Sequence, residues 1–283
     1  MAPVTSNLRL KKRFSNGKLK LSKFLHQRLV MPKPTHQVIA LILGCQRSGT
    51  TMLLNVFERD LRTKSYSENG WLKEYWPRMM PVDRIHDMLA DDRVPLVIAK
   101  PLMESQRTLE LLDEFPNAKA IWAHRGFAGV ANSRVKKFGE EVQFKLIRLI
   151  VEGDETEWSS ERLPVKLREL VRSVWRDDMT AYDAAALFWY VRNELFFTQD
   201  LGSNPRVRMC RYEEMASDPI RVIYEIYAFL GLEPPSQSAL AKVHGNSISK
   251  GRDLALAPEI HNLCVDMDQR LMKTHNAQQE TVG

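Results

Sequence analysis

The sequence of 283 residues contains few cysteines and no long apolar run. Its three cysteines, Cys45, Cys210 and Cys264, lack the spacing of metal ligands, and their odd number does not suit a disulfide framework. The apolar run 38–43 has the length of a buried strand, and no run approaches the roughly 18–20 residues that span a membrane. We therefore expect free thiols in a reducing, cytoplasmic compartment and no membrane-spanning helix.

Acidic residues are missing from the first 36 positions, which hold nine lysine or arginine residues. The other 247 positions carry 32 basic and 35 acidic residues, so the overall charge of +6 comes from this N-terminal arm. We predict a basic arm over 1–36 and one domain over 37–283. The arm could contact an anionic membrane surface or a polyanion, act as a transit peptide, or pack its short helix on the domain. The negative charge of the domain argues against specific nucleic-acid binding. One face of the arm's expected helix is apolar and consists of Leu21, Phe24, Leu25 and Leu29.

Short apolar segments rich in valine, isoleucine and alanine alternate with helical segments along the domain. Little polar alternation within the short segments indicates strands buried on both faces, as in a parallel sheet covered by helices. We predict an α/β fold of the P-loop type, a single domain with a helical insertion over 140–200. Strands are expected at 37–43, 94–100, 118–123 and 207–212, and helices at 49–60, 105–114, 126–138 and 218–230.

Residues 44–51 read Gly-Cys-Gln-Arg-Ser-Gly-Thr-Thr between the first strand and the first helix of the domain. This is the spacing of a phosphate-binding loop, in which backbone amides at the helix start, here those of Ser48, Gly49, Thr50 and Thr51, bind an anion. A nucleoside triphosphatase carries lysine where this chain has Thr50, and the cation here is Arg47. The loop therefore indicates phosphate binding without the lysine that reaches a γ-phosphate.

Two other groups of residues suit anions. Arg125 follows the third strand, and Ser133 lies eight residues later in the next helix. Lys250 and Arg252 flank Gly251 in a polar segment. Because ligands of parallel sheets bind at the carboxyl ends of strands, we expect the segments 44–51, 100–104 and 124–133 to converge with the segment after Tyr212.

Together these motifs resemble those of the PAPS-dependent sulfotransferase family, whose donor is 3′-phosphoadenosine 5′-phosphosulfate. The segment Arg47-Ser48-Gly49-Thr50-Thr51 is similar to the family's 5′-phosphosulfate loop, and Arg125 with Ser133 to its 3′-phosphate pair. Arg211-Tyr212-Glu213 resembles its late strand, which places Tyr212 near the adenine. The segment Lys250-Gly251-Arg252 is similar to the Lys-Gly that closes over the 3′-phosphate. The resemblance spans roughly residues 38–252.

The resemblance implies transfer of a sulfuryl group from PAPS to a hydroxyl or amine, with release of 3′,5′-ADP and no metal. The acceptor is unidentified and could be a carbohydrate or a lipid, because the expected acceptor segments, 62–93 and 139–180, carry no readable motif. A P-loop kinase or other nucleotide-dependent transferase is the alternative function, since it shares the fold and the loop. A polyanion-binding module acting through the arm is a second alternative.

The catalytic base does not follow directly from the motifs. Cytosolic enzymes of the family use the histidine of a Lys-Thr-His sequence, where this chain has Lys100-Pro101-Leu102. This place looks more like the Golgi-type and bacterial carbohydrate enzymes, which position a glutamate after the first helix. We predict Glu68 as the base and Lys100 as a group that stabilises charge in the transition state or orients the acceptor, with Glu104 and His124 as alternative bases. Trp71, Trp76 and Trp189 could line the site or pack in the core.

Overall fold

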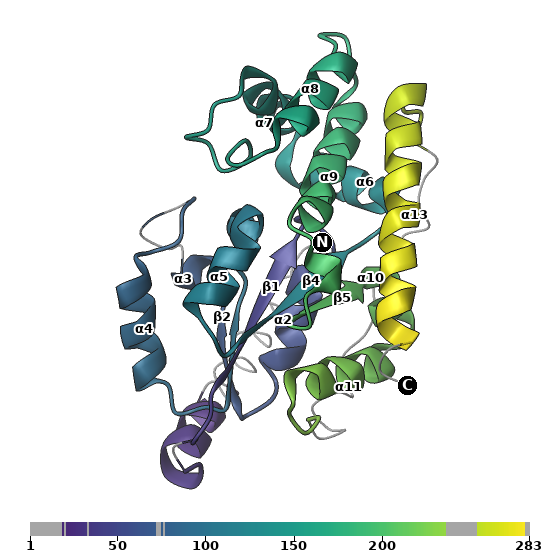
Figure 1. Cartoon of the computed structure of the whole chain (residues 1–283). Helices are drawn as coiled ribbons and strands as arrows, with labels where there is room; N and C mark the ends of the chain where they lie inside the picture. Colours follow the sequence, from purple (N-terminus) through teal and green to yellow (C-terminus); the bar gives the residue numbers. More distant parts are fainter. Residues whose placement is uncertain are drawn as a thin grey trace, which may run out of the picture.

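The protein forms one five-stranded parallel sheet covered by helices (Figure 1). The structure is a computed structural model that describes residues 19, 21–32, 34–71, 75, 77–235 and 254–280. The strand order is β2-β3-β1-β4-β5, and every neighbouring pair is parallel. The strands are β1 (Val38–Gly44), β2 (Thr63–Tyr66), β3 (Leu96–Ala99), β4 (Ala118–His124) and β5 (Val207–Arg211).

Strand β1 shows why a continuous apolar run forms the centre of this sheet. Its side chains alternate between two hydrophobic clusters: Leu41 and Leu43 join one, and Ala40 and Ile42 join the other. Both faces of the strand are therefore buried, as expected for a parallel sheet covered on both sides.

Helices α2 (Thr50–Phe57) and α11 (Pro219–Leu230) cover one face of the sheet, and the short α10 (Tyr212–Ser217) follows β5. The other face is covered by η2 (Leu102–Arg107), α5 (Thr108–Glu114), α6 (Phe127–Phe138), α9 (Ala181–Thr198) and α13 (Pro258–Glu280). Helix α9 is apolar on all sides and lies in the interior, which is typical of a fully buried helix.

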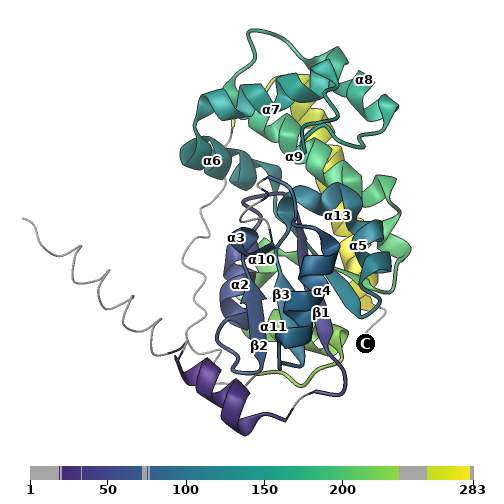
Figure 2. The ribbon, with the colours of Figure 1, turned by 90° about the vertical axis from the view of Figure 1, so that its left-hand side faces the viewer.

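The inserted helices α7 (Glu140–Glu152) and α8 (Val165–Val174) pack beyond the carboxyl edge of the sheet (Figure 2). The remaining elements are η1 (His26–Val30), α3 (Glu68–Trp71), α4 (Val82–Asp91) and η3 (Leu201–Ser203). The helical segment that ends in η1 lies at the opposite end of the molecule from α6 and α7 (Figure 2). Its apolar face is solvent-exposed, and Gln27 attaches it to the domain through hydrogen bonds to the carbonyls of Leu61 and Thr63.

The predicted α/β fold with its parallel sheet and helical insertion is confirmed, and the four predicted strands lie within about two residues of their expected ends. Strand β2 and helix α4 were not predicted, and both lie within the segment 62–93 that was expected to be an acceptor loop. Tyr212 begins a helix and does not end a strand. Within the described residues, no helix combines the length and the apolar character needed to cross a membrane.

Candidate active site

The predicted ligand-binding residues meet at the carboxyl edge of the sheet. Strand β1 leads into the loop 45–49, β3 into Lys100, β4 into Arg125 and β5 into Tyr212. Since all strands run in the same direction, their carboxyl ends lie at one edge, and the predicted convergence of these segments is confirmed.

The loop after β1 depends on two glycines with positive φ. A Cβ on Gly44 (φ +113°) would lie 2.4 Å from the carbonyl oxygen of Ala123 on the neighbouring strand. A Cβ on Gly49 (φ +84°) would lie 2.5 Å from the ring of Tyr212. Both distances are far below van der Waals contact, so glycine is required for the backbone conformation and for the close approach of the neighbouring groups.

The loop leaves polar groups available for an anion. No side chain forms a capping hydrogen bond at the start of α2. The amides of its first turn are therefore available to a ligand. The hydroxyl of Ser48 is buried and has no hydrogen-bond partner among the residues that the structure describes. These donors, with the positive end of the helix dipole, suit a phosphate or sulfate group.

Arg47 and Arg125 bring the loop and helix α6 together. Arg47 Nε donates a hydrogen bond of 2.9 Å to Ser133 Oγ. The Arg125 guanidinium lies over the ring of Tyr212, with its Cζ 4.1 Å from the ring centroid. A Cβ on Gly129 would lie 2.7 Å from Arg125 Nε, so this glycine leaves room for the arginine. Two cations from separate strand ends are therefore fixed in one place.

A first cavity of about 350 Å³ opens between the loop and α6. Arg47, Arg125 and Lys136 line it, and none of its described lining residues is acidic. This excess of positive charge favours an anionic ligand. Four lining residues, Met52, Gly129, Asn132 and Lys136, were not predicted from the sequence. Three of them continue the face of α6 that carries Ser133, at spacings of three or four residues, which a search from Ser133 along one helical face would have found. The full lining consists of Arg47, Gly49, Thr50, Thr51, Met52, Arg125, Gly129, Asn132, Ser133, Lys136 and Tyr212.

A second cavity of about 440 Å³ adjoins the first and shares Arg47, Thr50 and Thr51 with it. Lys100 lies at this junction, where its Nζ donates a hydrogen bond of 3.2 Å to Thr51 Oγ1. The remaining lining is mostly apolar and comes largely from η2, the end of α6, α7 and the segment after α7. It consists of Gln46, Leu102, Met103, Arg134, Lys137, Phe138, Val142, Lys145, Leu146, Leu149, Glu157 and Trp158.

The two alternative bases predicted from the sequence lie outside both cavities. Glu104 is completely buried, and its carboxylate accepts hydrogen bonds from the amide of Met79 at 2.9 Å and from Arg107 at 3.3 Å. His124 is also buried, with its ring 5.3 Å from that of His275. Burial is the main reason why the pKa of His124 lies well below its usual range, and the nearby His275 lowers this pKa further. Glu104 and His124 are therefore packed in the protein interior and do not face either cavity.

Burial also sets the protonation of two residues beside the loop. It raises the pKa of the Cys45 thiol, so this cysteine is a neutral, small core residue. Burial lowers the pKa of Arg134 to about 10, which leaves its guanidinium charged at neutral pH. Arg134 donates to the side-chain amide oxygens of Gln143 and Gln46 at 2.9 and 3.2 Å.

Several predicted residues remain untested by the geometry. Glu68 begins the short helix α3 after β2, but its side chain is not described. Lys250, Gly251, Arg252 and Trp76 lie outside the described residues.

Two of the tryptophans pack in the core. Trp71 is buried against Phe115, with ring centroids 5.7 Å apart. Trp189 is buried and donates from Nε1 to the carbonyl of Arg125 at 2.9 Å. It therefore holds the backbone of Arg125 in place but lines neither cavity.

Comparisons with known proteins give a family and a set of distant structures. The model of the family described as Sulfotransferase domain matches residues 39–256, about three quarters of the chain. No curated protein matches the chain in sequence.

Three solved structures illustrate the likeness. The sulfotransferase domain of the olefin synthase from Synechococcus PCC 7002 is 17% identical, with a TM-score of 0.47 over 84% of this chain and 98% of that domain. A sulfotransferase from Alicyclobacillus acidocaldarius is 15% identical, with a TM-score of 0.49 over 86% of this chain and 96% of that one. A mouse sulfotransferase complexed with PAP is 14% identical, with a TM-score of 0.42 over 92% of each chain. At this distance they identify neither a donor nor an acceptor.

Proposed function

Because this chain belongs to the sulfotransferase domain family and is a sulfotransferase, we propose that its donor is PAPS and that 3′,5′-ADP is its nucleotide product. The family predicted from the sequence is confirmed. The observation that carries the choice of donor is the first cavity, where a phosphate-binding loop without a P-loop lysine adjoins the Arg125–Ser133 pair. PAPS is anionic at both its 5′ and 3′ ends, and two neighbouring groups of cations and amides suit such a ligand.

In this proposal the loop binds the 5′-phosphosulfate and helix α6 binds the 3′-phosphate. The amides of residues 49–51 and the hydroxyls of Thr50 and Thr51 donate to the 5′ group, and Arg125 and Lys136 neutralise the 3′ group. The ring of Tyr212, which packs against Arg125, lies on the adenine side. Lys250, Gly251 and Arg252 complete the 3′ site as the resemblance implies.

Charge develops on the oxygen that links sulfur to the 5′-phosphate when the sulfuryl group leaves. Arg47 and Lys100 both line the second cavity at its junction with the loop, where they can stabilise this charge. No metal takes part in the proposed mechanism, and the described residues contain no group of three or more His, Cys, Asp or Glu that could hold one. In this proposal the acceptor approaches through the second cavity. The sequence predicts Glu68 as the base, but its side chain is not described, and the proposed donor does not depend on it.

Calorimetric titration of the purified protein with 3′,5′-ADP tests the donor. We expect binding without Mg²⁺, because the described cations alone neutralise the ligand. Arg125→Ala should weaken it by about 10-fold to 100-fold, the loss typical of a charge-assisted contact. Lys166→Ala, on the exposed surface of α8, is the matched control and should leave affinity unchanged. An absence of 3′,5′-ADP binding combined with Mg²⁺-dependent ATP binding would favour the kinase alternative.

A further inference from the structure

Helix α7 presents more apolar surface than the core requires. Its residues Gln143, Ile147 and Ile150 are completely buried on one side. A second row, formed by Val142, Leu146 and Leu149 with Lys145 among them, lines the second cavity. Spacings of three and four residues place this row on one face of the helix. A helix with two apolar faces needs a second apolar partner besides the core.

The rest of the cavity wall continues this apolar surface. Phe138 at the end of α6 and Val142 remain 39% and 38% exposed, which is high for large apolar side chains that line a cavity. Leu102, Met103 and Trp158 line the cavity from η2 and from the segment after α7. Polar lining side chains such as Gln46, Thr50 and Thr51 belong to the loop, where the donor is proposed to bind.

We propose that the second cavity binds an acceptor whose hydroxyl is carried by an apolar alkyl or aromatic body, and that Glu157 receives the proton of this hydroxyl. The inference rests on the proposed function, since it takes the loop as the sulfuryl-donor site. A sugar would place several hydroxyl groups against this apolar wall without hydrogen-bond partners, which is costly. The cations Arg134, Lys137 and Lys145 also line the cavity, and the lysine stems can add to its apolar lining.

Glu157 is the single carboxylate among the described residues that line this cavity. The acidic residues around it are engaged: Asp154 accepts from Thr156, and Glu161 forms an ion pair with Arg78 and accepts from Gln106 at 2.8 Å. In the part of the chain that the structure describes, the Glu157 side chain has no hydrogen bond or ion pair. It is therefore available to a ligand.

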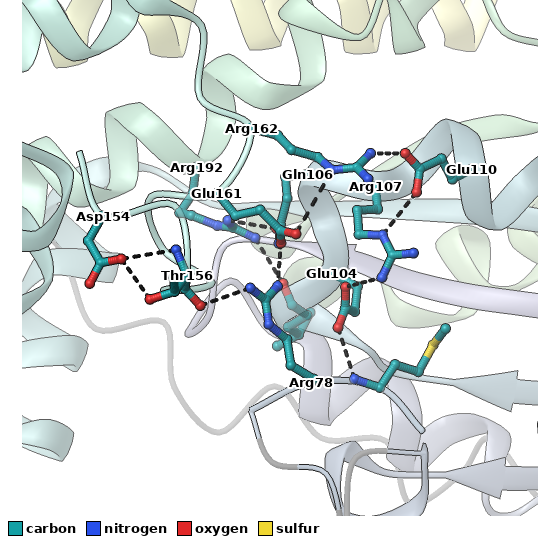
Figure 3. Close-up of polar contacts among 12 residues, drawn as sticks. Arg78, Glu104, Gln106, Arg107, Glu110, Asp154, Thr156, Glu161, Arg162 and Arg192 are labelled. Atoms are coloured by element: carbon teal, nitrogen blue, oxygen red, sulfur yellow. Dashed lines mark hydrogen bonds and ion pairs between the residues drawn. The ribbon is translucent and has the colours of Figure 1, made fainter. Parts of the chain in front are cut away.

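A polar network fixes the segment that carries Glu157 (Figure 3). On one side, Arg78 donates to the carbonyl of Thr156 at 3.0 Å and pairs with Glu161. On the other, the buried Arg192 donates to the carbonyl of Leu102 at 2.9 Å and to Gln106 at 3.2 Å.

Arg192 also ties this segment to the end of strand β3. Its Cζ lies 5.3 Å from the ring centroid of Trp158. Trp158 and Leu102 thus share one buried arginine, and Leu102 is two residues from Lys100. Glu157, next to Trp158, lines the same cavity as Leu102 and Lys100.

The proposed step conserves atoms and charge. The acceptor oxygen forms a new bond to sulfur as the bond between sulfur and the 5′-phosphate oxygen breaks. The electron pair of the broken bond stays on that oxygen, which leaves as part of 3′,5′-ADP. The hydroxyl proton moves to the Glu157 carboxylate and is later released to solvent.

A series of primary alcohols from ethanol to 1-octanol tests the acceptor class, with PAPS labelled in its sulfuryl group. If the alkyl chain lies on the α7 wall, kcat/KM should rise about fourfold for each CH₂ that becomes buried. Leu146→Asn should flatten this dependence, and Val165→Asn, at a 67% exposed position of α8, should not. The inference is overturned if 3′,5′-ADP binds but 1-octanol is not sulfated, or if N-acetylglucosamine is the better acceptor. A failure of 3′,5′-ADP to bind would instead refute the proposed donor.

The role of Glu157 is tested with Glu157→Gln, measured with 1-octanol. We expect kcat to fall by about 100-fold or more, because glutamine cannot accept the proton. The fall in kcat of the wild type at low pH should disappear in this variant, while affinity for 3′,5′-ADP stays unchanged. Glu155→Gln, at a 63% exposed carboxylate of the same segment, is the matched control and should behave as wild type. If Glu68→Gln removes the low-pH decline and Glu157→Gln keeps it, Glu157 is not the base.

Discussion

The guanidinium of Arg47 and the hydroxyl of Ser133 are joined by a hydrogen bond of 2.9 Å, although the two residues are 86 positions apart in the sequence. This contact connects the loop proposed to bind the 5′-phosphosulfate with the helix proposed to bind the 3′-phosphate. It also holds Arg47 at the boundary of the two cavities, since Arg47 lines both.

Arg47→Ala should therefore reduce kcat by about 1,000-fold, because it removes a cation that stabilises charge on the leaving group. Arg47→Lys should recover only part of this loss, since lysine lacks the planar fork that contacts Ser133 and an oxyanion together. Ser133→Ala should be milder, about 10-fold, and affect mainly donor affinity. Steady-state kinetics with PAPS, combined with calorimetry on 3′,5′-ADP, separate these effects. Equal kcat for Arg47→Ala and wild type would contradict this role.

Gly49→Ala should abolish 3′,5′-ADP binding, because its Cβ would meet the ring of Tyr212 at 2.5 Å. The control is Gly231→Ala, at a similar positive φ of +76° with no atom within 4 Å of the added Cβ. That variant should lose about 1–2 kcal/mol of unfolding free energy from backbone strain alone and keep its affinity for nucleotide. Chemical denaturation and calorimetry of both proteins provide the comparison. The loop geometry would be wrong if both variants bound 3′,5′-ADP equally well.

Lys100→Met should lower kcat by about 100-fold and change the Kd of 3′,5′-ADP by less than about threefold. The product nucleotide lacks the sulfuryl group, and Lys100 lies toward the second cavity, beside Thr51. Lys166→Met on the exposed face of α8 serves as the control. A large loss of 3′,5′-ADP affinity in Lys100→Met would place this lysine on the nucleotide and not on the transferred group.

Stability should fall as the pH drops below about 6.5, the ordinary pKa of histidine. Buried His124 has a lowered pKa and stays neutral in the folded state, while the unfolded chain takes up its proton. This difference costs about 1.4 kcal/mol per pH unit between 6.5 and the folded pKa. His124→Leu should therefore show a smaller decrease in Tm from pH 7 to pH 5 than wild type. The same substitution at exposed His36 should leave the decrease unchanged. An identical decrease in His124→Leu would contradict the account.

The sequence was sufficient to predict much of the first cavity, because this cavity is formed by local motifs at strand ends. Arg47, Arg125, Ser133 and Tyr212 were predicted to meet, and they do. Parallel strands bring their carboxyl ends to one edge, so knowing the strands was enough to bring the motifs together.

The segment 62–93 and the second cavity could not be predicted from the sequence in the same way. Strand β2 is only four residues long and polar in sequence, Thr-Lys-Ser-Tyr, so apolar periodicity does not mark it. Glu157 lies among other acidic residues, and only the folded structure shows that Glu161 pairs with Arg78 and that Asp154 accepts from Thr156. Glu104 was an alternative base because it follows β3, but in the folded chain its carboxylate accepts a hydrogen bond from the amide of Met79.

The two cavities draw on different parts of the chain, although they share Arg47, Thr50 and Thr51. The first cavity is built from the sheet edge, the starts of α2 and α10 and one face of α6, whereas the apolar wall of the second cavity comes largely from the insertion between residues 138 and 158. Substitutions along the cavity face of α7 can therefore change the second cavity without disturbing the first, which no residue of α7 lines. In an evolving lineage or in an engineered library, this separation makes the insertion the place to diversify and the sheet edge the place to leave constant.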